Sequence, residues 1–208
     1  LSVRNSDEDM KQLFEALKQK EAAPFILLGG LALMLFTAGM NLVASTSVSR
    51  EGKNFWISKL IPVTPKQQVT AKLIVSYLIS ASGIIVTGLI MWLYMEQSLL
   101  KVAGVAFVGL LGALPMVALN LILDVFHPKL IWNSEQEAMK QNMNGGIGML
   151  LSLLVMIIQG IVAAVMITAD LPVWSVFAVI GAVSVILGIL TVFALYAVAE
   201  KKFAELEA

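Results

Sequence analysis

The chain contains no cysteine, a single histidine and few charged residues. Without cysteine it can form no disulfide and no thiolate metal site, and His127 alone cannot build a histidine-based metal cluster. Charged residues make up 13% of the 208 residues and hydrophobic residues 59%, with a mean hydropathy of +0.88. Soluble domains contain about 25% charged residues, so this composition indicates an integral membrane protein. The net charge of zero argues against nucleic acid as a partner.

Sequence motifs of common catalytic and nucleotide-binding sites are also missing. There is no Gly-x-Ser-x-Gly, no His-Glu-x-x-His and no Walker motif. The glycines in the stretch 145–148 follow no predicted strand and carry no phosphate-binding lysine, so we expect them to let a helix start close to a neighbour. We therefore expect no enzymatic activity, no cofactor and no metal on this chain. The absence of these catalytic groups also argues against an intramembrane enzyme as an alternative class of protein.

Five long apolar runs predict membrane-spanning helices. A helix needs about 20 mostly apolar residues to cross a bilayer, and each run reaches that length without a formal charge. The runs are too continuous for the alternating pattern of a membrane barrel, so the sequence predicts an all-α, polytopic transmembrane bundle. The predicted spans are residues 24–46, 73–95, 102–123, 145–169 and 173–199.

Basic residues between the spans predict the orientation of the chain. Three segments share one side by parity and are rich in Lys and Arg: 47–72, 124–144 and the tail 200–208. The links on the opposite side, 96–101 and 170–172, contain one basic residue, Lys101. Residues 1–23 contain more acidic than basic residues. By the positive-inside rule, the three basic segments are cytoplasmic, the N-terminus is outside and the C-terminus is inside.

An extracytoplasmic amphipathic helix is predicted within residues 1–23. Residues 6–20 can form it, because Ser6 can cap its start and its apolar residues follow helical spacing. Two interpretations stay open: the helix covers an exit on the outer surface, or it is a linker that lies on the bundle or the headgroups. The apolar positions are Met10, Leu13, Phe14 and Leu17.

The most polar stretch, 49–72, follows the first span and is SREGKNFWISKLIPVTPKQQVTAK. Its first part predicts a short amphipathic helix that Pro62 ends, because proline cannot donate the helical hydrogen bond. Thr64 can then cap a new helix, with Pro65 at the first position and Gln67 closing a capping box. In this arrangement the proline corner joins the short helix to the second span, so a displacement of the short helix would be transmitted to that span. The alternative is an ordinary positive-inside loop with an interfacial helix. The apolar face comprises Trp56, Ile57, Leu60 and Ile61.

At these residues the chain resembles the ABC-2-type transporter permeases. The match rests on Ser49-Arg50-Glu51-Gly52, on Pro62-Val63-Thr64 and on DVFHPKLIWNSEQEAMKQN at 124–142, which is similar to a loop of putative bacterial ABC exporter permeases. The family has six-span units with a coupling loop between the second and third spans. Here that loop follows the first span, so the resemblance implies that an earlier span is missing, in agreement with the outside N-terminus.

The resemblance implies a permease subunit, or the C-terminal part of one, that couples a separate ATPase to export. ATP would be bound and hydrolysed on that partner, not on this chain. The further partners implied are a second permease unit, as a homo-oligomer or the other half of a longer chain, and membrane lipids. The implied location is a bacterial cytoplasmic membrane. The ATPase-docking residues would be Arg50, Glu51, Phe55, Trp56, Lys59 and Leu60. A membrane scaffold or assembly protein without transport activity is the alternative.

Polar residues and a proline inside the predicted spans are candidates for gating or for a transport path. Pro115 lies in the middle of a span and predicts a kink. The small residues of the second span, such as Ser80, can instead form a helix-packing seam. Asp124 lies at the inner end of the third span, where we expect it to contact water. The candidate gating or pathway residues are Asn41, Ser80, Pro115, Asn120 and Gln159.

Overall fold

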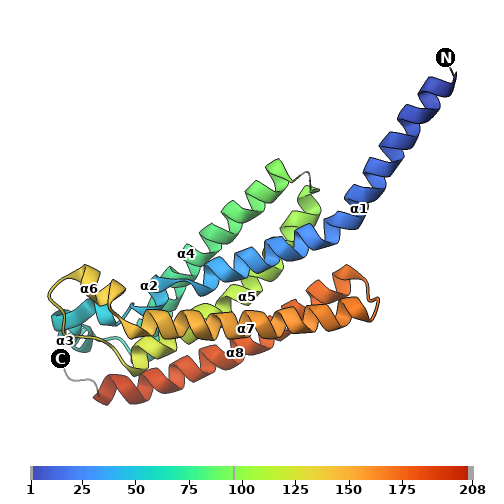
Figure 1. Ribbon diagram of the computed structural model, residues 1–208. Helices are drawn as coiled ribbons and strands as arrows, with labels where there is room; N and C mark the ends of the chain where they lie inside the picture. Colours follow the sequence, from blue (N-terminus) through green and yellow to red (C-terminus); the bar gives the residue numbers. More distant parts are fainter. Residues whose placement is uncertain (1, 96, 206–208) are drawn as a thin grey trace.

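The computed structural model describes residues 2–95 and 97–205, which form helices joined by short loops and contain no strand (Figure 1). Their side chains are described except at 2–9, 14–21, 59, 135, 140 and 204. The elements are α1 (Ser2–Gly39), α2 (Leu42–Ser45), the 3-10 helix η1 (Ser49–Asn54), α3 (Phe55–Leu60), α4 (Pro65–Tyr94), α5 (Leu99–Phe126), α6 (Glu135–Lys140), α7 (Met143–Thr168) and α8 (Val173–Glu205).

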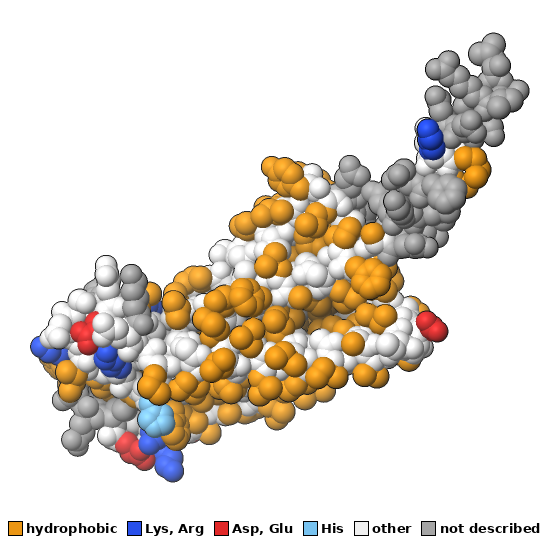
Figure 2. All heavy atoms as spheres, in the orientation of Figure 1, with side chains coloured by type: hydrophobic (Ala, Val, Ile, Leu, Met, Phe, Trp, Pro, Cys, Tyr) orange, Lys and Arg blue, Asp and Glu red, His pale blue; other side chains and the backbone are white. Residues whose placement is uncertain are grey.

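The predicted all-α fold and its membrane-spanning helices are confirmed at the level of length and composition. Within the described residues, five helical segments are long and apolar enough to cross a membrane, and each overlaps one predicted span. Helix α5 is central, because it contacts α1, α4, α7 and α8. The outer faces of the bundle are apolar and exposed, as expected of helices that face lipid (Figure 2).

The first helix differs from its prediction at both ends. The amphipathic helix predicted at 6–20 and the span predicted from residue 24 are one helix, α1, which continues through Pro24. Ser6 therefore lies inside a helix and does not cap one. Its N-terminal part projects away from the other helices (Figure 1). Met10 and Leu13 are exposed, whereas the predicted positions Phe14 and Leu17 lie outside the described side chains.

The predicted first span also ends early. Helix α1 stops at Gly39 rather than at residue 46, because Asn41 begins a new short helix. The side-chain oxygen of Asn41 accepts hydrogen bonds from the backbone N–H groups of Val43 and Ala44, at 3.0 and 3.2 Å. Asparagine competes with the regular helical ladder in this way and favours helix starts. The helix is therefore interrupted between Gly39 and Leu42, a few residues before the polar stretch begins.

The polar loops gather at one end of the bundle, which we call the loop end. Figure 1 places η1, α3 and α6 there, beside the C-terminal turns of α8. Figure 2 shows most of the coloured Lys, Arg, Asp and Glu side chains at this end of the visible face. The described parts of the segments that were predicted to share one side of the membrane, 47–72, 124–144 and 200–205, are thus together in space.

Two apolar clusters form the core. One lies along α1, α4, α5 and α8, with Met34, Ile84 and Met116 wholly buried. The other lies at the loop end and joins α4, α5 and α8 to the polar loops through side chains such as Phe55 and Leu195. The second cluster matters for function, because it makes the short helix α3 part of the bundle.

Candidate functional site

A buried carboxylate holds the loop end together. Asp124, in the last turn of α5, has no exposed surface. Its Oδ2 accepts hydrogen bonds from the backbone N–H groups of Val48 and Ser49, at 2.5 and 3.0 Å. Its Oδ1 accepts from the Ser49 hydroxyl and from Asn144 Nδ2, the latter at 3.1 Å. The expectation that Asp124 contacts water is therefore wrong, and four donors replace its hydration.

Ser49 is bound from several directions at once. Its hydroxyl accepts hydrogen bonds from Asn142 Nδ2 and from the Lys129 backbone N–H, both at 2.9 Å. Its carbonyl accepts a hydrogen bond of 2.8 Å from the Trp132 indole. We call Ser49, Asp124, Asn142 and Asn144 the Asp124 junction. It ties the start of η1 to the end of α5 and the start of α7, so these three elements are fixed relative to one another.

Gly52 is required beneath Trp132. Its φ of +51° lies in the left-handed region that favours glycine. A Cβ atom at Gly52 would also lie 2.6 Å from Cζ2 of the Trp132 ring. The indole therefore packs directly on the loop backbone, and the two segments that carry the family resemblance meet at this point.

A second set of contacts joins α3 to the base of α4. Glu51 forms an ion pair with Lys72 and accepts a hydrogen bond of 2.8 Å from the Ser58 hydroxyl. Gln68 Nε2 donates to the Ser58 carbonyl at 2.6 Å. The predicted capping box between Thr64 and its N3 partner starts α4, with Pro65 in its first turn. Helix α3 is thus coupled to α4 by side chains on both sides of the proline corner.

Phe55 does not belong to the exposed docking surface that the sequence predicts. Its side chain is wholly buried, and its ring lies 5.5 Å from that of Phe203 in α8. Successive residues point about 100° apart around a helix, so Phe55 and Trp56 cannot face the same side. Phe55 anchors α3 to the bundle, and its predicted role as an exposed docking residue is wrong.

The predicted apolar face of α3 is exposed. Trp56 has 52% of its surface exposed and Leu60 71%, and Ile57 and Ile61 are exposed beside them. Lys59, a predicted docking residue, lies outside the described side chains. Exposed apolar groups in a row are typical of a surface that binds another protein or a membrane. The part of the chain that the structure describes leaves this face uncovered.

Helix α6 is held by a separate group of hydrogen bonds around Glu137. Glu137 accepts hydrogen bonds from Lys129 Nζ, at 3.1 Å, and from the Asn133 backbone N–H, at 3.0 Å. The Asn133 N–H and Lys129 lower the pKa of the Glu137 carboxyl below its ordinary value. A lowered pKa means that these contacts persist above the ordinary pKa and are lost as the pH falls through the lowered value.

The predicted pathway residues mostly bond to neighbouring helices. Asn41 Nδ2 donates to the Ser80 hydroxyl at 2.8 Å, and Asn120 Nδ2 donates to the Ser152 hydroxyl at 3.0 Å. Pro115 is buried inside α5, which continues through it. These contacts favour the interpretation of a packing seam, in which polar side chains join helices within the membrane.

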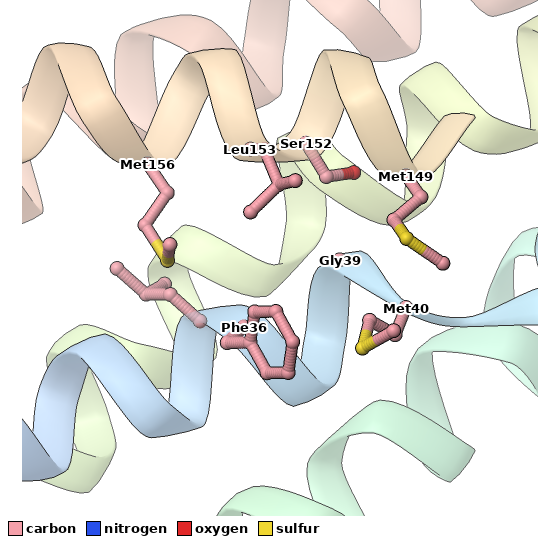
Figure 3. A pocket seen from close by; sticks show the side chains of 8 residues that line it. Phe36, Gly39, Met40, Met149, Ser152, Leu153 and Met156 are labelled. Atoms are coloured by element: carbon pink, nitrogen blue, oxygen red, sulfur yellow. The ribbon is translucent and has the colours of Figure 1, made fainter. Parts of the chain in front are cut away.

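The seam between α1 and α7 is closed. Figure 3 shows Ser152, Leu153 and Met156 of α7 facing Phe36 and Gly39 of α1. The remaining cavity of about 10 Å³ holds no more than one water molecule. Gln159, one helical turn further, lines a groove of about 350 Å³ between α1, α7 and α8. Its side chain is buried, and its Nε2 donates a hydrogen bond of 3.2 Å to the Ser184 hydroxyl in α8.

The fold and the loop end define the class of the chain as a polytopic helical membrane protein with a structured polar end. Comparisons with protein-family models, curated proteins and solved structures find no match.

Proposed function

We propose that this chain is the membrane subunit, or the C-terminal part of one, of an ATP-driven exporter of the ABC-2 type. The observation that carries the proposal is the exposed apolar face of α3. This helix is hydrogen-bonded to α4, packs on α8 through Phe55, and directly follows η1, which is hydrogen-bonded to α5. A partner ATPase would bind this face. A membrane scaffold would need an exposed surface too, but it would not need that surface coupled to several spanning helices.

The contacts of α3 offer a physical route for coupling. A displacement of α3 acts on α4 through Glu51 and Lys72, on α8 through Phe55, and on α5 through Ser49 of η1. Packed helices move as rigid bodies between discrete arrangements, so a small motion at such a joint changes the tilt of whole spans. ATP hydrolysis takes place on the partner in this proposal, and the chain transmits the motion.

The orientation follows from the same proposal. The loop end is cytoplasmic in a bacterial plasma membrane, the N-terminus is outside and the C-terminus is inside. A second permease unit completes the translocation path. Of the docking residues predicted in η1, Glu51 is already paired with Lys72 inside the chain, and Arg50 lines a groove beside that pair.

Photo-crosslinking in cells tests the docking surface. A photoreactive residue at Leu60 should crosslink to an ATPase subunit, identified by mass spectrometry, because Leu60 is 71% exposed on α3. Leu100 is the matched control, since it is 84% exposed and begins the helix at the opposite end of the bundle. Crosslinks from Leu60 to lipid alone would contradict the docking proposal and favour the scaffold with an interfacial helix.

A substitution measures the strength of the same contact. Leu60→Asp should weaken binding of the ATPase by roughly tenfold or more, because buried apolar anchors dominate interface energies. Leu100→Asp should leave binding unchanged. We choose Leu60 over a charge reversal at Glu51, since the Glu51 change would also break the ion pair with Lys72 within the chain. Equal affinities of the two variants for the ATPase would contradict the proposal.

A further inference from the structure

A second open space lies at the loop end, between η1 and the first turns of α4. It is a groove of about 340 Å³, which is within the usual size of a ligand site. Its lining combines cations, hydroxyls and aliphatic side chains, unlike the apolar groove beside Gln159. The lining residues are Val43, Ser47, Arg50, Glu51, Ala71, Lys72, Val75 and Ser76.

Two polar atoms of this lining have no hydrogen-bond partner among the described residues. Arg50 Nε and Ser76 Oγ are both buried and without a hydrogen bond. The Ser76 side chain belongs to a residue with no exposed surface. Buried polar groups in proteins are normally satisfied, and each one left unpaired costs about 1–3 kcal/mol. Two such atoms in one groove indicate a ligand that accepts hydrogen bonds.

The charge of the lining favours an anion. Lys72 is neutralised by Glu51, whose other oxygen accepts from Ser58. Lys72 also donates to the Ser47 carbonyl at 3.3 Å, and an ammonium group has three protons to donate. Arg50 forms no ion pair with a described side chain, so within the described lining the groove has one uncompensated positive charge. A guanidinium fork matches the oxygens of a phosphate group better than those of a neutral ligand.

The surroundings identify the source of that phosphate as a lipid. Val75 lines the groove with 54% of its surface exposed, and the exposed Leu78 and Ile79 continue the same outer side of α4 for another turn. The groove also lies where the charge-free run of α4 begins, which is the level of the headgroups. A phospholipid can place its phosphate at Arg50 and its acyl chains along this apolar side.

We propose that this groove binds the phosphate of an anionic glycerophospholipid, with Arg50 as its main cation and Ser76 as a hydrogen-bond donor. The proposal is independent of the ATPase partner, because it needs only the chain and a bilayer. It assigns Arg50 to a lipid rather than to protein docking. The zwitterionic headgroup of phosphatidylcholine fits less well, since its quaternary ammonium would lie near Arg50 and Lys72.

Native mass spectrometry of the purified chain tests the proposal with phosphatidylglycerol and phosphatidylcholine as probes. Phosphatidylglycerol should be retained in preference to phosphatidylcholine, and Arg50→Gln should reduce its retention by fivefold or more. Lys53→Gln is the matched control, because Lys53 lies in the same 3-10 helix, is exposed and does not line the groove. Ser76→Ala should reduce retention less than Arg50→Gln, and circular dichroism verifies that each variant is folded.

Three outcomes would overturn the proposal. If Lys53→Gln reduces retention as much as Arg50→Gln, the attraction is a general effect of positive charge. If inorganic phosphate displaces phosphatidylglycerol at equal concentration, the groove is a site for the free anion. If folded Arg50→Gln retains both lipids as the unmodified chain does, Arg50 does not bind a headgroup.

Discussion

At the scale of single residues, Asp124 shows how a charge at the end of a spanning helix can be structural. Four donors surround its carboxylate: the backbone N–H groups of Val48 and Ser49, the Ser49 hydroxyl, and Nδ2 of Asn144 in α7. Hydrogen bonds to a charged group each contribute about 1.5–3 kcal/mol. The carboxylate therefore determines where the polar stretch joins the bundle.

Replacing this carboxylate by an amide should destabilise the chain. In Asp124→Asn, an NH₂ group replaces one carboxylate oxygen. This group cannot accept a hydrogen bond from the donors that now bind that oxygen, so at least one hydrogen bond is lost, at a cost of about 1.5–3 kcal/mol. Thermal unfolding followed by circular dichroism measures the effect. Asp170→Asn is the control, because Asp170 is exposed at the opposite end of the bundle. Equal melting temperatures of the two variants would show that the junction contributes no stability.

At the scale of elements, the start of α7 is placed by its glycines, as the sequence predicts. A Cβ atom at Gly148 would lie 1.9 Å from Asn120 Oδ1 in α5, and one at Gly145 would lie 2.9 Å from Leu42 Cδ2. At Gly146 a Cβ atom would meet nothing within 4 Å. The glycines thus differ in role although they stand side by side in the sequence.

The pair Gly148→Ala and Gly146→Ala tests this close approach. Gly148→Ala should destabilise the bundle by about 1–3 kcal/mol, because the added methyl group forces α7 away from α5. Gly146→Ala should be neutral or stabilise the helix by up to about 1 kcal/mol, since alanine is the better helix former. Chemical denaturation in detergent compares the two. A loss of stability in Gly146→Ala as large as in Gly148→Ala would contradict the assignment.

The same elements show what the sequence could and could not predict. Apolar runs predict the spans because lipid requires each helix to satisfy its own backbone, and the capping box at Thr64 is a local pattern. The break at Asn41 depends on side-chain hydrogen bonds that compete with the helical ladder, and α1 continues through Pro24 although proline usually ends a helix. The role of Asp124 depends on Ser49, 75 residues earlier, so no local pattern reveals it. Phe55 was misassigned because an aromatic residue suits both a core and an interface.

At the scale of the whole molecule, the polar loops that the structure describes between the spans fall at the two ends of one bundle. Segments 47–64 and 127–142 lie at the loop end, and the link 169–172 lies at the other (Figure 1). The distribution of basic residues between these ends predicts which one is cytoplasmic.

Cysteine labelling tests the predicted orientation, because the unmodified chain has no cysteine to interfere. In intact cells a membrane-impermeant maleimide should label Leu171→Cys and should label Lys53→Cys only after lysis. Both positions are exposed in the structure, so accessibility within the protein does not limit either reaction. Labelling of Lys53→Cys in intact cells would reverse the orientation and would also remove the basis for docking a cytoplasmic ATPase.

The indole of Trp132, which lies on Gly52 and donates to the Ser49 carbonyl, has a spectroscopic consequence. The other three tryptophans, Trp56, Trp92 and Trp174, are 42–53% exposed. With those three replaced by phenylalanine, the fluorescence of the chain would come from Trp132 alone. Its emission wavelength would then report, in real time and without an added dye, whether the two loops stay together or separate when a partner is added.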